Sequence, residues 1–269
     1  MSAGTVPPAP GPLGDRVAGR TALVTGAGNG LGRVISLALA SLGARVLLVG
    51  RTRATLDAVA AEAGGLAGSV RVATVDVGDP GSVEELAREV ADEQVEILVN
   101  NAGVPGPVAA LVDVEPHEWD AVFAVNVRGV YLMCRAFVPA MVQRGAGDVI
   151  NLSSVSGKRP LTRRTPYTAS KMAVIGLTTT LAYEVGPLGV TVNSLSPGPV
   201  RGPRMARNFA LEAERTGTTY EQAEEAYVSR AALHRMVEED EVAAAVVAML
   251  HMPGLCAADI DLSAGMVAR

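Results

Sequence analysis

The segment Thr25-Gly26-Ala27-Gly28-Asn29-Gly30-Leu31-Gly32 lies between two apolar segments of different periodicity. Thr21–Thr25, before it, is a short apolar run typical of a buried strand, and Leu31–Leu42, after it, has the spacing of a helix. Glycines between a first strand and a first helix let the chain turn tightly and bring backbone N–H groups up to a pyrophosphate. The segment therefore predicts a dinucleotide-binding turn, with a glycine-rich turn that serves only packing as the alternative.

The same alternation of strand and helix continues along the chain. Strands are expected at Thr21–Thr25, Arg45–Val49, Val70–Val75, Ile97–Asn100, Asp148–Ser153, Thr191–Ser196 and Asp259–Leu262. Helical spacing marks Leu31–Leu42, Ser82–Ala91, Trp119–Gln143, Thr168–Val185 and Glu239–Leu250. This alternation predicts an α/β fold, a doubly wound parallel sheet with helices on both faces. We expect a flexible tail at 1–18 and a single domain at 19–269, with a helical substrate lid at about 199–237.

Composition excludes several classes of protein. Of the 269 residues, 49% are hydrophobic and 19% charged, which favours a globular chain over a disordered one. A net charge of -5 gives no reason to expect nucleic acid, and apolar runs such as Val242–Leu250 are shorter than the roughly 20 residues that cross a bilayer. Cys134 and Cys256 suggest no disulfide framework, and the scattered histidines suggest no metal site. We therefore expect a cytoplasmic protein that binds neither nucleic acid nor membrane.

The end of the second expected strand bears on the choice of dinucleotide. An acidic residue there would accept hydrogen bonds from the adenosine ribose and repel a 2′-phosphate. The chain instead reads Gly50-Arg51-Thr52-Arg53, and Asp57 comes too late, on the following helix. The guanidinium of Arg51 suits a phosphate, so the sequence favours NADP(H) over NAD(H). The alternative is that Arg51 and Arg53 are ordinary solvated side chains.

Three further segments end strands on the same edge of the sheet. They are Asp76-Val77, Asn100-Asn101-Ala102-Gly103 and Pro197-Gly198. Ligands of open α/β sheets bind at this edge, where Asp76 could hydrogen-bond the adenine amino group. Asp76 could instead cap the helix near Ser82, and the asparagine segment could be simple turn chemistry. The expected cofactor-binding residues are Gly26, Asn29, Gly30, Leu31, Arg51, Thr52, Asp76, Val77, Asn101, Ala102, Gly103, Tyr167, Lys171, Pro197, Gly198 and Val200.

Tyr167 and Lys171 are four residues apart at the start of a helix, which places both on one face. A free phenol titrates near 10, and a neighbouring ammonium stabilises the phenolate and lowers that pKa. Ser153 and Ser154 end the fifth strand, where a hydroxyl could bind a substrate carbonyl while the tyrosine donates its proton. The alternative is that both residues lie on the surface of the helix, which is the commoner case for such a pair on its own.

Together these motifs resemble the short-chain dehydrogenase/reductase superfamily, in its common form of about 250 residues, over roughly residues 19–265. The motifs are Thr25-Gly26-(three residues)-Gly30-Leu31-Gly32, Asp76, Asn100-Asn101-Ala102-Gly103, Asn126-Val127-Arg128-Gly129, Ser154, Tyr167 with Lys171, and Pro197-Gly198. The resemblance implies one Rossmann domain of seven parallel strands, and a homodimer or homotetramer formed through the helices after the fourth and fifth strands.

The resemblance also implies a role for each catalytic residue. Tyr167 would be the general acid in reduction and the base in oxidation, and Ser154 would polarise the carbonyl. Lys171 would hold the nicotinamide ribose and lower the tyrosine pKa, and Asn126 would hold a water that links Lys171 to solvent. The family's spacing selects Ser154 over Ser153.

Two positions depart from the family's pattern. Asn29 stands where many NADPH-using members carry Arg or Lys, so the expected phosphate site depends on Arg51 and its neighbour. Gly202 stands where the family usually has a Thr that bonds the nicotinamide carboxamide, a role that a backbone group or Arg201 could take.

The mouth of the expected site is cationic. Its basic residues are Lys158, Arg159, Arg163, Arg164, Arg201, Arg204 and Arg207. They suggest an anionic or strongly polar substrate group, against the alternatives of a solvated basic rim or a subunit interface. The leading expectation is an NADPH-dependent reductase of a ketone, of the carbonyl or 3-oxoacyl type. The alternatives are an NAD-dependent alcohol dehydrogenase acting oxidatively and a non-catalytic nucleotide-binding regulatory protein.

Overall fold

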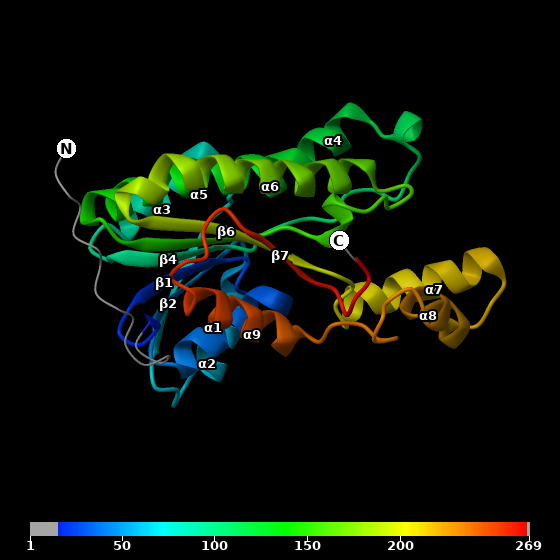
Figure 1. Ribbon diagram of the computed structural model, residues 1–269, viewed down its shortest axis with the longest axis horizontal. Helices are drawn as coiled ribbons and strands as arrows, with labels where there is room; N and C mark the ends of the chain where they lie inside the picture. Colours follow the sequence, from blue (N-terminus) through cyan, green and yellow to red (C-terminus); the bar gives the residue numbers. More distant parts are fainter. Residues whose placement is uncertain (1–15, 268–269) are drawn as a thin grey trace.

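A computed structural model describes residues 16–267, arranged as one parallel sheet between two layers of helices (Figure 1). The expected tail at 1–18 lies almost entirely outside these residues. The strands of the sheet are β1 Thr21–Thr25, β2 Arg45–Gly50, β3 Ser69–Thr74, β4 Val95–Asn100, β5 Gly147–Leu152, β6 Val190–Pro197 and β7 Asp259–Leu262. Their order is β3-β2-β1-β4-β5-β6-β7, and every pair is parallel. The seven expected strands and the doubly wound fold are confirmed.

The strands form because short runs of aliphatic residues can be buried on both faces of a parallel sheet. Successive side chains point to opposite faces, and β2 shows this directly. Val46 and Leu48 pack into one hydrophobic cluster, whereas Leu47 and Val49 pack into the other. The two clusters are the two halves of the core.

Helices cover both faces of the sheet (Figure 1). One face carries α1 Gly30–Ser41, α2 Arg53–Glu62 and α9 Glu239–Leu250. The other carries α3 Pro80–Glu89, α5 Gly129–Arg144 and α6 Thr165–Val185, and α4 Pro116–Phe123 packs against α6. Short 3₁₀ turns lie at η2 Leu111–Asp113, η4 Val155–Gly157 and η5 Gly186–Leu188.

The single helix expected at Trp119–Gln143 is interrupted. A π-helical turn, η3 Ala124–Arg128, separates α4 from α5. Periodicity does not reveal such a turn, because the chain stays helical and the apolar spacing changes little. By length and composition the continuous stretch Pro116–Arg144 could cross a membrane, which corrects the expectation that apolar segments are too short. In the fold the α5 part of this stretch packs on the sheet, with Met133 and Met141 fully buried.

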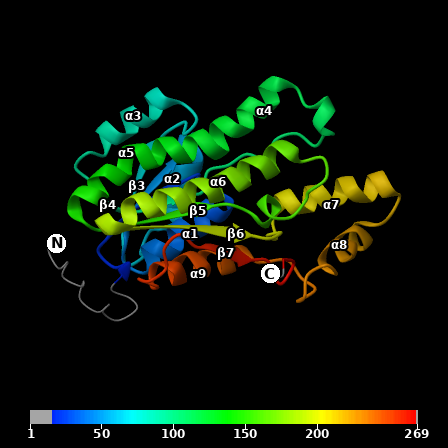
Figure 2. The same cartoon turned by 45° about the horizontal axis from the view of Figure 1, so that its top comes forward.

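Beyond the end of the sheet, α7 Pro203–Thr216 and α8 Tyr220–Val228 form a projecting arm (Figure 2). The two helices pack on each other around Phe209. Its ring centroid lies 5.9 Å from that of Tyr220 and 5.6 Å from that of Tyr227, in edge-to-face geometry. The arm begins and ends at a parallel backbone bridge between Val200 and Val237. It therefore occupies the segment where a helical lid was expected, and its action as a lid stays a prediction.

Candidate active site

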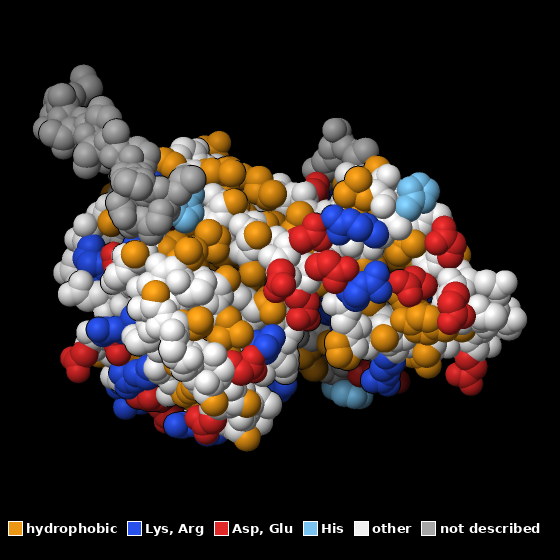
Figure 3. Space-filling view, turned by 90° about the horizontal axis from the view of Figure 1, so that it is seen from below, with side chains coloured by type: hydrophobic (Ala, Val, Ile, Leu, Met, Phe, Trp, Pro, Cys, Tyr) orange, Lys and Arg blue, Asp and Glu red, His pale blue; other side chains and the backbone are white. Residues whose placement is uncertain are grey.

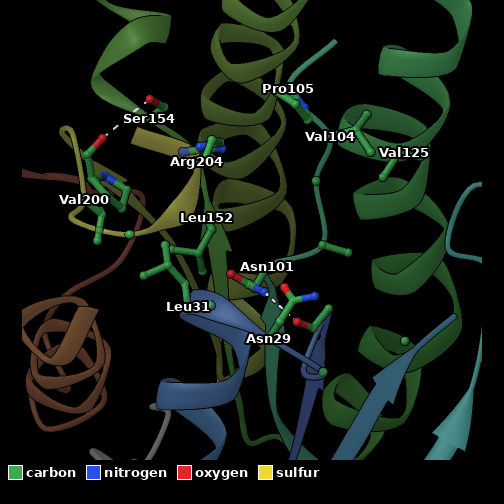
Figure 4. A pocket seen from close by; sticks show the side chains of 18 of the residues that line it. Asn29, Leu31, Asn101, Val104, Pro105, Val125, Leu152, Ser154, Val200 and Arg204 are labelled. Carbon is green, nitrogen blue, oxygen red and sulfur yellow. Dashed lines mark hydrogen bonds between the residues drawn. The ribbon is translucent and has the colours of Figure 1, made fainter. Parts of the chain in front are cut away.

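A cavity of about 590 Å³ opens at the carboxyl ends of the strands (Figure 4). All sixteen of the expected cofactor-binding residues line it, together with the expected catalytic Ser154. Asn126 is the one expected site residue that does not. Sequence reasoning missed Thr55 on α2 and Glu239 on α9, which also line the cavity, because neither belongs to a motif at a strand end.

The glycine turn after β1 depends on a close approach of backbone to backbone. A Cβ on Gly32 would lie 2.1 Å from the carbonyl oxygen of Gly26, and Gly26 itself has a positive φ of 68°. The turn is held to β4, because the Asn101 side-chain amide donates to the Thr25 carbonyl at 2.9 Å. Asn29 precedes α1 without a side-chain hydrogen bond that caps the helix. The N–H groups of α1 are thus available to a phosphate, which is what a dinucleotide needs here.

The end of β2 presents one unpaired cation. Asp57 lies within α2, as expected, and forms an ion pair with Arg53 at 2.8 Å. Arg51 is exposed, lines the cavity, and forms no ion pair with any residue in the described range 16–267. Thr52 beside it does not cap α2 with its side chain. Arg51 and the start of α2 together can accept a 2′-phosphate.

Asp76 lies at the end of β3, exposed at the cavity wall. Its carboxylate accepts from the Gly78 N–H at 2.9 Å. The alternative that Asp76 caps the next helix is wrong, because Asp79 is the cap and accepts from Ser82 N–H at 2.8 Å. The Asp76 carboxylate keeps free lone pairs for a ligand donor such as an adenine amino group.

Ser154, Tyr167 and Lys171 meet at one wall of the cavity. Lys171 is buried, donates to the Leu152 carbonyl at 2.7 Å, and places its ammonium 5.8 Å from the centre of the Tyr167 ring. The hydroxyl of Ser153 donates to the Lys171 carbonyl at 2.8 Å. Ser153 and Ser154 both line the cavity, but this bond commits the Ser153 hydroxyl to the backbone of α6.

Electrostatics prepare the phenol for proton transfer. Burial raises the pKa of Tyr167, but the charges of Lys171 and Arg204 and hydrogen bonding to Ser154 and Arg204 outweigh it, so the pKa lies below its ordinary value. Burial lowers the pKa of Lys171, and the charge of Arg204 lowers it further, against the opposing effect of Tyr167. A phenol of lowered pKa can exchange a proton more readily near neutral pH.

Asn126 lies in the π-helical turn and is fully buried behind Gly103. Its amide donates to the Val104 carbonyl and to the Ser170 hydroxyl, both at 3.0 Å, and accepts from the Val104 N–H at 2.8 Å. These bonds fix the chain after β4, next to Lys171. The expected role of Asn126 in a water relay stays a prediction.

The expected cationic rim is smaller than the sequence suggests. Lys158 is buried in ion pairs with Asp259 and Asp261 of β7, and Arg201 pairs with Glu224 and Glu238 at 3.2 and 3.0 Å. Acidic and basic side chains are interspersed over the arm (Figure 3). The acidic partners are distant in sequence, so composition of the basic segments alone could not reveal them. Two of the basic residues expected at the mouth, Arg201 and Arg204, line the cavity.

Gly202, the unusual position after Pro197-Gly198, precedes the first residue of α7 and lies next to Glu239. It has no side chain to bond a carboxamide. Arg201, the proposed substitute, is engaged by its two glutamates, which leaves backbone groups for that role.

The fold and this site define a dinucleotide-dependent oxidoreductase of the α/β class. The family model described as short chain dehydrogenase matches residues 20–213. The 3-oxoacyl-(acyl-carrier-protein) reductase of Thermotoga maritima is 34% identical over 230 residues, covering 85% of this chain and 89% of the relative. The chain belongs to the short-chain dehydrogenase family.

Two solved structures share the fold and differ in the cofactor that they hold. An actinorhodin polyketide ketoreductase with NADPH matches with a TM-score of 0.86 and 30% identity, covering 93% of this chain and 98% of that one. An NAD⁺-bound xylitol dehydrogenase matches with a TM-score of 0.86 and 26% identity, covering 93% and 99%. The likeness therefore supports an NAD(P)(H)-dependent oxidoreductase.

We predict that Gly32→Ala destabilises the turn and weakens NADPH binding. The added Cβ meets the Gly26 carbonyl, and overpacking of this kind costs about 1–3 kcal/mol. Urea unfolding and fluorescence titration with NADPH measure the two effects. Gly81→Ala, in the first turn of α3 where a Cβ meets only ordinary contact at 3.5 Å, is the matched control. Equal stability and affinity in the two variants would contradict the close approach.

Proposed function

We propose that this protein reduces a ketone to a secondary alcohol with NADPH, in the manner of a carbonyl or 3-oxoacyl reductase. The observation that carries the proposal is the wall formed by Ser154, Tyr167 and Lys171, in the same cavity as the unpaired Arg51. When bound, NADPH supplies hydride to the carbonyl carbon. The glycine turn, the uncapped start of α1 and Asp76 fit such a group.

The side chains of this protein bind the carbonyl and transfer the proton. Ser154 donates a hydrogen bond to the carbonyl oxygen and holds it beside the Tyr167 phenol. Tyr167 gives its proton to that oxygen as negative charge develops. Lys171, fixed by the Leu152 carbonyl, stabilises the phenolate that remains and reaches the nicotinamide ribose. In the oxidative direction the same groups act in reverse.

An NAD-dependent alcohol dehydrogenase remains the second candidate. Its support is Asn29, which supplies no cation to a 2′-phosphate. A regulatory protein without catalysis is less well supported, because it would not need Ser154, Tyr167 and Lys171 together in the cavity.

The expected dimer or tetramer and the expected cytoplasmic location stay predictions. Tyr131 on α5 and Tyr183 on α6 are 49% and 81% exposed, and an interface through these helices would cover them.

The Michaelis constant for NADPH should be at least about tenfold lower than that for NADH, because the Arg51 guanidinium binds the 2′-phosphate. Arg51→Ala should raise the constant for NADPH and leave that for NADH nearly unchanged. Arg53→Ala removes a cation already paired with Asp57 and serves as the control. Steady-state kinetics with both cofactors measure this, and a preference for NADH would overturn the assignment.

Tyr167→Phe should lower turnover by about 10³-fold or more, because the variant has no proton to give, while the affinity for NADPH is retained. A panel of ketones and alcohols followed by nicotinamide absorbance supplies the assay. Retained turnover in the variant would remove Tyr167 from the mechanism. Wild-type protein that binds NADPH and turns over nothing would favour the regulatory alternative.

The pH dependence should follow the lowered pKa of Tyr167. Oxidation needs the phenolate, so its kcat/KM should rise with pH and level off below pH 10, the ordinary phenol value. Reduction needs the phenol and should decline across the same range. Lys171→Met removes a stabilising charge and should move the rise toward higher pH. A wild-type midpoint at or above the ordinary phenol value would contradict the electrostatic account.

A further inference from the structure

The substrate end of the cavity contains a guanidinium group that the reaction itself does not require. Arg204 lies in the first turn of α7 and lines the cavity with Ser154, Tyr167 and Lys171. Figure 4 shows it on the same side of the cavity as Ser154. The charge of Arg204 acts on the Tyr167 phenol and, after that of Lys171, helps to lower its pKa. A group bound to Arg204 would therefore lie next to the reacting carbonyl.

Arg164 supplies a second cation beside it. This residue precedes α6, and its guanidinium donates to the carbonyls of Pro105 and Gly106 at 3.2 and 3.4 Å and to the Asn208 side chain of α7 at 3.4 Å. These bonds fix Arg164 between the chain after β4 and the arm. Burial and, second to it, the charge of Arg204 lower the pKa of Arg164, so the two guanidinium groups repel each other.

Within residues 16–267, Arg164 and Arg204 form no ion pair, whereas Lys158 and Arg201 are each held by two carboxylates. The carboxylates that line the cavity are Asp76, after β3, and Glu239, which lies against Gly30 and Gly202 and forms no ion pair with Arg204. Arg164 is half-buried and Arg204 is exposed, and a bound anion would relieve the repulsion between their like charges.

A carboxylate fits this arrangement best. The planar guanidinium of Arg204 can bind both oxygens of a carboxylate at once, which fixes direction as well as position. Because Arg204 lines the same cavity as Ser154 and Tyr167, we infer a substrate whose carbonyl lies one or two carbons from its carboxylate. A longer spacer would move the carbonyl away from the phenol.

We propose that Arg204, supported by Arg164, binds a substrate carboxylate, and that the protein interconverts short 2- or 3-oxo acids with their hydroxy acids. This deepens the proposed function and rests on it. In reduction, hydride from NADPH forms the new C–H bond at the carbonyl carbon, and the C=O π pair takes the Tyr167 proton. The products are the hydroxy acid and NADP⁺, and Tyr167 regains its proton from solvent.

The test compares short oxo acids with their methyl esters, which keep the reacting carbonyl and lose the charge. With wild-type protein and NADPH, kcat/KM for the best acid should exceed that for its ester by at least about tenfold. Arg204→Gln should reduce this ratio to near one, mainly through the Michaelis constant of the acid. Arg204→Lys keeps the charge without the planar fork and should retain part of the preference.

Arg207→Gln is the matched control. Arg207 lies one turn further along α7, is exposed and does not line the cavity, and its loss changes the net charge equally. The acid-to-ester ratio should be unchanged in this variant. An equal fall in both variants would indicate a general effect of charge and would overturn the assignment to Arg204.

Two other results would overturn the proposal and leave the proposed reductase standing. One is that esters and neutral ketones are reduced as well as the acids. The other is that Arg204→Gln raises the Michaelis constant for NADPH and leaves the acid-to-ester ratio unchanged, which would assign Arg204 to the cofactor.

A binding measurement separates this proposal from failure of the reaction. Calorimetric titration of the NADP⁺ complex with butyrate and with butyramide needs no turnover. Butyrate should bind at least about tenfold more tightly, and Arg204→Gln should abolish the difference. If butyrate binds more tightly than butyramide but no acid is turned over, the anion site is supported and the proposed reductase activity is rejected. Equal binding of the two probes would reject the anion site.

Discussion

All seven strands run in the same direction, and the site depends on this constraint. Every carboxyl end then lies on one edge of the sheet, and the order changes direction between β1 and β4. The two strands are joined there by the Asn101 amide on the Thr25 carbonyl and by the Thr25 hydroxyl, which accepts from the N–H groups of Asn101 and Ala102. Backbone positions at this edge are thereby set by the core, and the loops need to carry only the chemistry.

That constraint explains why sequence reasoning located the cofactor residues well. Gly26, Asp76 and Pro197 follow strands that short aliphatic runs predict, and all three line the cavity. The order of strands in a doubly wound sheet brings them together without any knowledge of side-chain contacts. The same holds for Tyr167 and Lys171, because helical spacing alone puts them on one face.

Features that depend on contacts between distant segments were not predictable in this way. The π-helical turn places the Asn126 amide against the backbone of Val104. These hydrogen bonds form only when the helix and the chain after β4 pack together. Lys158 looks like a surface cation in sequence, yet β7 brings Asp259 and Asp261 to it a hundred residues later. In both cases a polar side chain is satisfied by a partner that local sequence cannot supply.

The backbone bridge between Val200 and Val237 joins the two ends of the arm, so the arm is attached to the rest of the fold at one place. The chain leaves the domain and returns to it at one point, and the arm has its own apolar cluster around Phe209, separate from the two clusters at the sheet. The family match ends at residue 213, inside α7. The arm can thus be exchanged, lengthened or shortened in evolution without repacking the two clusters at the sheet. A lineage could change its substrate in this way while keeping its cofactor and its redox chemistry.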